Sequence, residues 1–262
     1  MERDQIAAAA RTLHEHWQAG TKLAALKPAQ RPLNRADGYA IQAAIERCSA
    51  GGLFGWKIAA TSEAGQKHIN VKGPMAGRIL AETVIADGGT ALMAGNEMRV
   101  AEPEFGFRFA HDIGPRATPY TTAEVMAAVR DLHLTIELPD SRFRDFARVG
   151  GATLIADNAC TRELVVGPRV SVDWRSLDLA GHAVHAQVGT RYTRDGIGSN
   201  VLGDPRKALA WLVNEVTALG LTIKAGELVT TGTCVVPLEI EPGDEVRADF
   251  GSLGRIAVKI VR

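Results

Sequence analysis

The chain has 262 residues, enough for one large domain with a substantial core. Thirty Lys and Arg balance thirty Asp and Glu, so the chain lacks the positive charge typical of proteins that bind nucleic acid or anionic membrane surfaces. It has no signal-peptide pattern and no run of about 18 uncharged apolar residues. Cys48, Cys160 and Cys234 show no metal-binding or disulfide spacing. We expect a cytoplasmic protein with reduced thiols, in which Cys48 and Cys234 are buried.

The chain begins with two alanine-rich segments that carry apolar residues at helical spacing. They cover residues 4–19 and 35–50 and are separated by a segment containing Pro and Arg. This pattern predicts two helices, which together form a small helical N-terminal part, residues 1–52.

From residue 53 onward, short runs rich in Val, Ile, Phe and Thr alternate with Gly and Pro, which is typical of strands. These runs are residues 53–60, 76–80, 98–109, 132–138, 181–190, 227–236 and 244–261. Two helices are predicted between them. One covers 121–132 with Thr122 as N-cap, and the other covers 203–220 with Asp204 as N-cap and Pro205 as its first helical residue.

No internal repeat or low-complexity linker divides the chain. The sequence therefore predicts an α+β, mainly β fold, in which a β-rich core, residues 53–262, is continuous with the helical N-terminal part.

The predicted strand VAEPEFGFRF, residues 100–109, places Glu102 and Glu104 on one face and its phenylalanines on the other. The aromatic face is expected in the core. Carboxylates two residues apart on a strand are roughly 7 Å apart at the backbone, which allows their oxygens to converge on one cation. Pro103 between them removes a ladder N–H, so an edge or a bulge is expected there.

A third carboxylate, Glu137, lies in the predicted strand 132–138 on the face opposite Leu134, Ile136 and Leu138. Three oxygen ligands suit Mg²⁺ or Mn²⁺. A charged residue at every second position more often forms a solvated face, so the pattern alone leaves both interpretations open. The chain has no nucleophile elbow, phosphate-binding loop, zinc-protease motif or dinucleotide fingerprint.

Several short motifs occur in a characteristic order: GWKIAATSEAGQKHI, EPEFGF, IEL, IADNA, GSNVLGDPRKALAWL, TTGT and PGDEVRADFGSLG. This series resembles the 2-keto-4-pentenoate hydratase and 4-oxalocrotonate decarboxylase branch of the fumarylacetoacetate hydrolase superfamily, over nearly the whole chain. The resemblance implies a rolled or barrel-like mixed sheet and a homo-oligomer that acts on a small 2-oxo or 2-hydroxy-enoate substrate in aromatic-compound catabolism.

The resemblance further implies that Glu102, Glu104 and Glu137 are metal ligands. In that family, the cation binds the carboxylate and the 2-oxo oxygen of a short keto acid. It thereby stabilises negative charge on the enolate.

Two residues match catalytic positions of the family. Lys57 is expected to bind a substrate carboxylate or to pass a proton. Without the family resemblance, the pattern predicts a lysine at a strand end whose ammonium reaches solvent. Asp157 is expected to orient groups or relay protons, with a helix cap or turn as the alternative.

Three further residues are expected at the substrate. Gly232 and Thr233 match a loop that contacts substrate oxygens, although ordinary turn chemistry explains them equally well. Cys160 stands where relatives often carry a pocket Ser, and a small apolar filler is its simpler interpretation.

The resemblance favours hydration of a 2-hydroxy-2,4-dienoate to a 4-hydroxy-2-oxo acid. The chain departs from the family at Met75, where an Asp is expected, which weakens the case for hydration specifically. The alternatives are decarboxylation of a 2-oxo-3-enedioate, C–C hydrolysis of a β-diketo acid, and binding of keto acids without catalysis. Arg78, Arg108 and Arg162 are possible clamps for a distal carboxylate.

Overall fold

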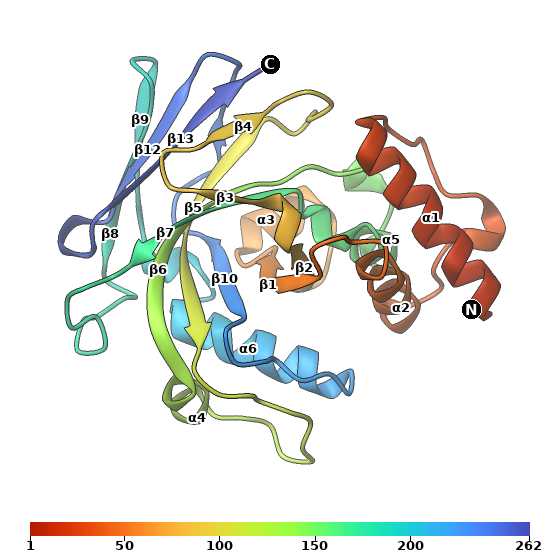
Figure 1. Cartoon of the computed structure of the whole chain (residues 1–262), viewed down its shortest axis with the longest axis horizontal. Helices are drawn as coiled ribbons and strands as arrows, with labels where there is room; N and C mark the ends of the chain where they lie inside the picture. The colour runs from red at the N-terminus through yellow and green to blue at the C-terminus, as the bar shows by residue number, and fades with distance from the viewer.

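A computed structural model describes residues 1–262 (Figure 1). The six α-helices are α1 (Arg3–Ala19), α2 (Arg35–Glu46), α3 (Glu63–His68), α4 (Thr122–Ala127), α5 (Gly151–Ala156) and α6 (Pro205–Ala218). The strands are β1 (Leu53–Ala59), β2 (Met75–Leu80), β3 (Val84–Ala86), β4 (Thr90–Leu92), β5 (Val100–Phe109), β6 (Val129–Leu138), β7 (Glu163–Arg169), β8 (Ala183–Val188), β9 (Tyr192–Ile197), β10 (Leu228–Thr233), β11 (Leu238–Glu239), β12 (Glu245–Asp249) and β13 (Arg255–Val261).

Helices α1, α2 and α5 form a layer at one end of the molecule, on the right in Figure 1. Asn34 caps α2 by accepting a hydrogen bond from the Asp37 N–H. The apolar faces of α1 and α2 share a small core with two residues from the second half of the chain, Phe143 and Ala156. The N-terminal helices are therefore packed directly against the β-rich part.

The larger sheet has the strand order β2-β1-β10-β5-β6-β7-β3, with β11 paired to one end of β5. The sheet curls strongly, which brings side chains from strands that are far apart in this order into contact. Ile79 of β2, Leu164 of β7 and Leu228 of β10 form one buried apolar cluster, which we call the apolar plug. The mixed, curled sheet and its helical flank confirm the predicted fold class.

The second sheet has the order β4-β13-β12-β8-β9 and packs against the first. The aromatic face of β5 lies between them, as its alternation predicts. Phe105, Phe107 and Phe109 are fully buried, and the Phe105 ring contacts the Phe250 ring edge to face with centroids 5.2 Å apart. The opposite face of β5 consequently points into the curl of the larger sheet.

Helix α6 begins at its predicted cap, since the Asp204 side chain accepts a hydrogen bond from the Arg206 N–H. The helix predicted over 121–132 is partly wrong. It is capped by Thr121 rather than Thr122, and it ends at Ala127 because the following residues pair with β5 as part of β6. Helix α2 also ends earlier than predicted, at Glu46.

Five strands and two short helices were not predicted from the sequence: β3, β4, β7, β9, β11, α3 and α5. Strand β7 was missed although it pairs with β6 through most of its length. Cys234 is buried as expected, whereas Cys48 is exposed after the end of α2, so that part of the cysteine prediction is wrong.

Pro103 lies inside the larger sheet rather than at an edge, but a bulge lies beside it. Between Thr230 and Thr233, β10 has one residue more than the facing segment of β5, Glu104 to Gly106. The predicted irregularity is thus present on the neighbouring strand.

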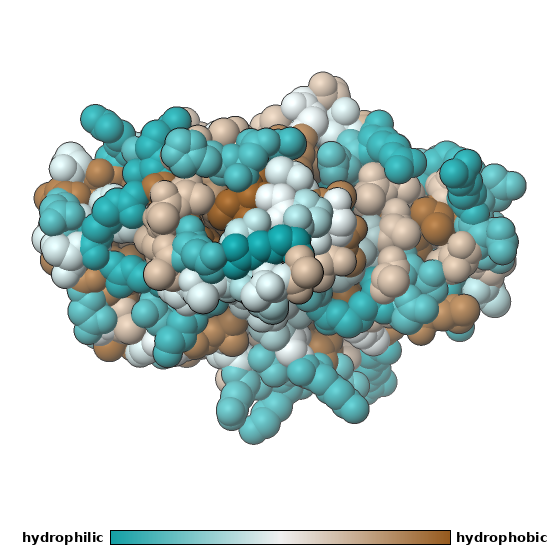
Figure 2. Space-filling model, turned by 90° about the horizontal axis from the view of Figure 1, so that it is seen from below, coloured by the Kyte–Doolittle hydropathy of each residue, from teal (hydrophilic) through white to brown (hydrophobic).

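The face below α4 and α6 is mainly hydrophilic, with apolar residues in small groups (Figure 2). None of the helices has the length and apolar character required to cross a membrane.

The apolar plug gives a stability prediction. Leu228→Ala should lower the free energy of unfolding by about 2–5 kcal/mol, because it leaves a cavity between β2, β7 and β10. The matched control is Leu92→Ala, whose side chain is 55% exposed and whose loss should change stability by about 0.5 kcal/mol or less. Urea unfolding measures both, and equal losses would contradict the existence of the plug.

Candidate active site

Three carboxylates meet inside the curl of the larger sheet. Glu102 on β5 lies directly opposite Glu137 on β6, and Glu104 lies opposite Thr135. Each carboxylate offers an oxygen within 4.8 Å of the others. Glu104 and Glu137 are buried and Glu102 is partly exposed, so the cluster is reached from one side.

Glu104 is held by β10. Its Oε2 accepts a hydrogen bond from the Gly232 N–H at 2.8 Å and another from the Thr230 hydroxyl. Thr135 donates to the Glu104 carbonyl oxygen, which ties β6 to the same point. The bulge in β10 makes this possible, because it turns the Gly232 N–H away from the strand ladder.

The remaining oxygens of Glu104 and Glu137 have no partner within the chain other than the Lys57 ammonium, which pairs with Glu137 Oε1. Glu104 Oε1 and both oxygens of Glu137 are buried and accept no well-aligned hydrogen bond. Buried acceptors are normally satisfied, so this arrangement is costly for the protein alone. Burial and the charge of Glu137 raise the pKa of Glu102 to about 7, against the opposing effect of Lys57, and burial likewise raises the pKa of Glu104 and Glu137. Orphaned carboxylate oxygens that converge at this spacing fit a divalent cation.

Lys57 lies in the middle of β1 and its side chain is buried, so it is not a lysine that reaches solvent from a strand end. Its Nζ is 2.9 Å from Glu137 Oε1 and donates a hydrogen bond of 2.9 Å to the Ala159 carbonyl oxygen. Strands β1 and β6 are separated by β10 and β5 in the sheet, so this ion pair spans the curl. Burial alone lowers the pKa of Lys57, but Glu137 and Glu102 outweigh it and raise it.

The Ala159 carbonyl is aimed at Lys57 by a left-handed turn. Asn158, Ala159 and Cys160 all have positive φ, between 49° and 62°, although none is glycine. The Asn158 side chain fixes the turn to β2 by accepting from the Arg78 N–H and donating to the Arg78 carbonyl oxygen. Gly77 leaves room for it, since a Cβ there would lie 2.7 Å from the Asn158 oxygen and 3.0 Å from Lys57 Cδ.

Asp157 lies at the start of this turn, and its carboxylate is engaged within the protein. Arg142 forms an ion pair with it, and the Ser141 hydroxyl donates to it at 2.6 Å. Arg142 also donates to the backbone oxygens of Asp157 and Thr161, which bracket the turn. These contacts describe a group that shapes the backbone beside Lys57.

Cys160 is buried at the end of the turn, and burial raises the pKa of its thiol to about 12. Burial therefore favours the neutral form of this thiol. Gly232 faces Glu104 through its N–H, while the Thr233 hydroxyl donates to the Val235 carbonyl oxygen within its own turn.

The three arginines considered as clamps are engaged elsewhere. Arg78 pairs with Glu46 and stacks on Trp56, Arg108 donates to the Gly226 carbonyl oxygen, and Arg162 pairs with Asp140. Met75 is fully buried on β2 opposite Ala59, so strand alternation places it on the same face as Lys57.

Sequence reasoning missed several contributors. Thr230 and Thr135 hold Glu104, and the Ala159 carbonyl holds Lys57. Thr230 belongs to the TTGT motif, but no signal distinguished its hydroxyl from that of Thr233. The role of a backbone carbonyl has no signature in sequence.

The site thus consists of three clustered carboxylates and a buried lysine inside a curled mixed sheet. Residues 59–261 match the family described as Fumarylacetoacetate (FAA) hydrolase C-terminal. The chain belongs to this family, as its motifs indicate.

Two relatives and one solved structure extend this finding. The chain is 30% identical over 257 residues to a 2-keto-4-pentenoate hydratase of Burkholderia vietnamiensis (strain G4 / LMG 22486), covering 97% of this chain and 96% of the relative. It is 27% identical over 230 residues to a 4-oxalocrotonate decarboxylase of Pseudomonas putida, covering 86% and 85%. The structure of 4-oxalocrotonate decarboxylase from Pseudomonas putida G7, complexed with magnesium and adipate, has the same fold, with a TM-score of 0.90 at 23% identity, over 100% of this chain and 99% of that one.

The carboxylate cluster gives a prediction for metal-free protein. The pKa of Glu102 rises from an ordinary 4.5 to about 7 on folding, so the folded state binds more protons than the unfolded state in that window. Stability from this cluster should therefore fall as pH rises from about 4.5 to about 7. Glu104→Gln should reduce this fall and raise the melting temperature at pH 8 by about 2–4 °C, because one repelling charge is removed.

The same variant should lose stabilisation by Mn²⁺, since one of three ligands is gone. Glu97→Gln, at an exposed position, is the matched control and should behave as wild type. Melting curves with chelator and with Mn²⁺ measure both effects. Full Mn²⁺ affinity in Glu104→Gln would show that the cluster is not the cation site.

Proposed function

We propose that this protein is a divalent-cation-dependent lyase that adds water to a 2-hydroxy-2,4-dienoate, giving a 4-hydroxy-2-oxo acid. The observation that carries the proposal is the cluster of Glu102, Glu104 and Glu137 with Lys57 paired to it. Similarity along nearly the whole chain to a 2-keto-4-pentenoate hydratase supports the reaction type.

Glu102, Glu104 and Glu137 would hold the cation, and their hard carboxylate oxygens suit Mg²⁺ or Mn²⁺. When bound, the cation supplies Lewis-acid stabilisation of negative charge on a 2-oxo acid. Thr230 and the Gly232 N–H keep Glu104 oriented, so the site is organised by the protein before any ligand arrives.

Lys57 is the proton-handling and anion-binding group. An ammonium has three N–H donors, and two of them face Glu137 and the Ala159 carbonyl oxygen, which leaves one for the substrate. Hydration requires loss of the 2-hydroxyl proton, gain of a proton at the terminal carbon of the diene, and addition of water one carbon nearer the carboxylate. Lys57 can deliver or accept such a proton because both of its partners hold it in place.

Met75 makes this site more apolar than one with an acidic residue at that position. Its side chain is buried on the same face as Lys57 and carries no proton. Lys57 or a water molecule must therefore carry out the proton transfers. A terminal CH₂ of a dienoate matches the apolar environment that Met75 provides.

Decarboxylation of a 2-oxo-3-enedioate is the second candidate, supported by the 27% identical 4-oxalocrotonate decarboxylase. A dicarboxylate needs a second cation beyond Lys57. Arg78, Arg142 and Arg162 are each paired with an acidic side chain of this protein, and Arg108 donates to the Gly226 carbonyl oxygen. These contacts favour a monocarboxylate. Hydration is therefore the first choice.

The direct test follows the ultraviolet absorbance of 2-hydroxypenta-2,4-dienoate with and without Mg²⁺, with the product identified by NMR. Mg²⁺-dependent formation of 4-hydroxy-2-oxopentanoate is expected. Carbon dioxide release from 2-oxo-3-hexenedioate without hydration of the dienoate would establish the decarboxylase instead. Affinity for oxalate with no turnover of either compound would establish a non-catalytic binder.

The role of Lys57 gives a mutational prediction. Lys57→Met should lower kcat by about 100-fold or more, because it removes the proton carrier. Mn²⁺ binding should persist, since the three carboxylates remain. Lys72→Met, at an exposed position, is the control and should retain full activity. Loss of activity by less than tenfold in Lys57→Met would exclude Lys57 as the proton carrier.

A further inference from the structure

Thr61 is the buried threonine whose hydroxyl has no partner in the chain. Seven threonines are buried: Thr61, Thr83, Thr135, Thr161, Thr217, Thr230 and Thr231. Every one except Thr61 donates its hydroxyl to an oxygen of the protein. The side chain is 6% exposed, and its oxygen is not among the enclosed side-chain atoms that lack a partner, so the hydroxyl is open to solvent and free to meet a ligand.

The hydroxyl of Thr61 lies against Gly232, which is hydrogen-bonded to the carboxylate cluster. A Cβ on Gly232 would fall 2.2 Å from Thr61 Oγ1, so the two residues are in direct contact. The Gly232 N–H in turn donates to Glu104 Oε2. Gly232 has φ of 104°, and only glycine leaves the space that the Thr61 hydroxyl occupies.

The backbone around Thr61 is bent to hold it there. Ala60 has φ of 60°, which reverses the chain directly after β1, and Ser62 then caps α3 by accepting from the Gly65 N–H. On the other side, the Leu202 N–H donates to the Thr61 carbonyl oxygen, and Leu202 also has a positive φ. Left-handed non-glycine residues are costly and concentrate where function requires them.

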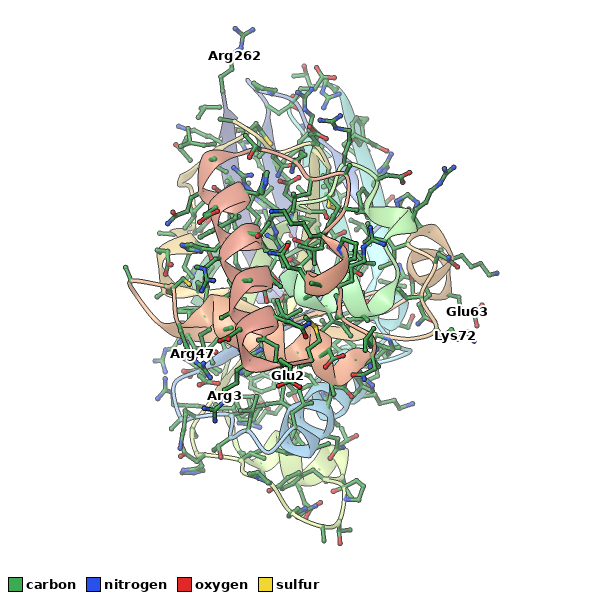
Figure 3. The ribbon with its side chains drawn as sticks, turned by 90° about the vertical axis from the view of Figure 1, so that its right-hand side faces the viewer. Glu2, Arg3, Arg47, Glu63, Lys72 and Arg262 are labelled. Atoms are coloured by element: carbon green, nitrogen blue, oxygen red, sulfur yellow. The ribbon has the colours of Figure 1, made fainter.

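The segment after Thr61 leads outward. Glu63, at the start of α3, and Lys72, beyond its end, point away from the body of the molecule at its periphery (Figure 3). Thr61 therefore stands where the chain passes from the buried end of β1 to the rim, which is a suitable place to contact a small ligand that enters toward the cluster.

We propose that the Thr61 hydroxyl donates a hydrogen bond to a carboxylate or 2-oxo oxygen of the substrate and is a substrate-binding residue of this site. The proposal rests on the proposed function, since it requires a small 2-oxo acid at the cluster. It assigns to Thr61 the hydroxyl contact that the sequence suggested for Thr233, whose own hydroxyl is bonded within its turn.

The test compares Thr61→Val, Thr61→Ser and the control Thr217→Val. Valine keeps the shape of threonine without its hydroxyl, and Thr217 donates within α6 to the Val213 carbonyl oxygen. Oxalate is the probe, because its adjacent oxygens imitate the carboxylate and 2-oxo group of a 2-oxo acid. Calorimetry gives the affinity for Mn²⁺ alone and for oxalate at saturating Mn²⁺, and melting curves without ligand give stability.

Thr61→Val should bind Mn²⁺ as wild type does, melt at the same temperature or higher, and bind oxalate about tenfold or more weakly. Thr61→Ser should recover most of the oxalate affinity, and Thr217→Val should bind both ligands as wild type. Unchanged oxalate affinity in Thr61→Val would overturn the proposal. So would weaker Mn²⁺ binding, which would make the hydroxyl a cation ligand, or a large fall in melting temperature, which would make it a structural group.

Failure of the proposed function gives different results. If no small 2-oxo acid binds at the cluster, the wild-type protein binds no oxalate in the presence of Mn²⁺, and the variants cannot differ from it. If oxalate binds but the dienoate is not hydrated, the hydratase reaction is excluded while the comparison of the Thr61 variants still stands. Wild-type binding with no effect of Thr61→Val overturns the assignment of Thr61 alone.

Discussion

The meeting of three carboxylates on two adjacent strands, two of them buried and one partly exposed, is the constraint on which the rest of the structure depends. Like charges at this separation destabilise the folded state unless they are protonated, paired or bound to a cation. The chain compensates part of this negative charge: two hydrogen-bond donors contact Glu104, and the Lys57 ammonium pairs with Glu137. The curl of the sheet follows from the same need, because it brings β1 across to β6 and closes the apolar plug beneath.

Backbone strain is concentrated around this cluster. Seven non-glycine residues have positive φ, and five of them border the site: Ala60, Asn158, Ala159, Cys160 and Leu202. Each left-handed residue of this kind costs on the order of 1–3 kcal/mol and persists only when its surroundings enforce it. The Arg142 and Asn158 hydrogen bonds enforce the 158–160 turn, and the α3 cap together with the Leu202 N–H enforces the bend at Ala60. The two strained turns place one carbonyl against Lys57 and one hydroxyl against Gly232.

The sequence predicts those parts of this arrangement that depend on local periodicity. Alternation along β5 is enough to place Glu102 and Glu104 on one face and the phenylalanines on the other, because a strand has a fixed period of two. The N-cap of α6 can be predicted for the same reason, because capping depends on residues next to each other in the chain. The end of α4 could not be predicted, since pairing with β5 overrides the helical pattern after Ala127.

Contacts between distant segments could not be predicted from these patterns. The family resemblance pointed to Lys57, but the pairing of Lys57 with Glu137 requires the curl of the sheet. Its hydrogen bond to the Ala159 carbonyl requires a left-handed turn, and that turn contains no glycine from which it could be predicted. Asp157 illustrates the same limit. Its motif suggested a role in the pocket, whereas its partners Ser141 and Arg142 come from the loop after β6. A motif identifies the residue, but only the folded structure shows which groups its carboxylate oxygens contact.

The two acceptors of Lys57, Glu137 and the Ala159 carbonyl, have different effects on its ammonium. Glu137 supplies charge, which keeps the ammonium protonated in a buried place, but a Glu137 oxygen that coordinates a cation becomes a weaker acceptor for Lys57. The Ala159 carbonyl is neutral and fixed by the turn, so it is not drawn toward the cation in the same way. The position of the ammonium therefore does not depend on Glu137 alone. This explains why a strained turn is maintained beside a lysine that already has a carboxylate partner.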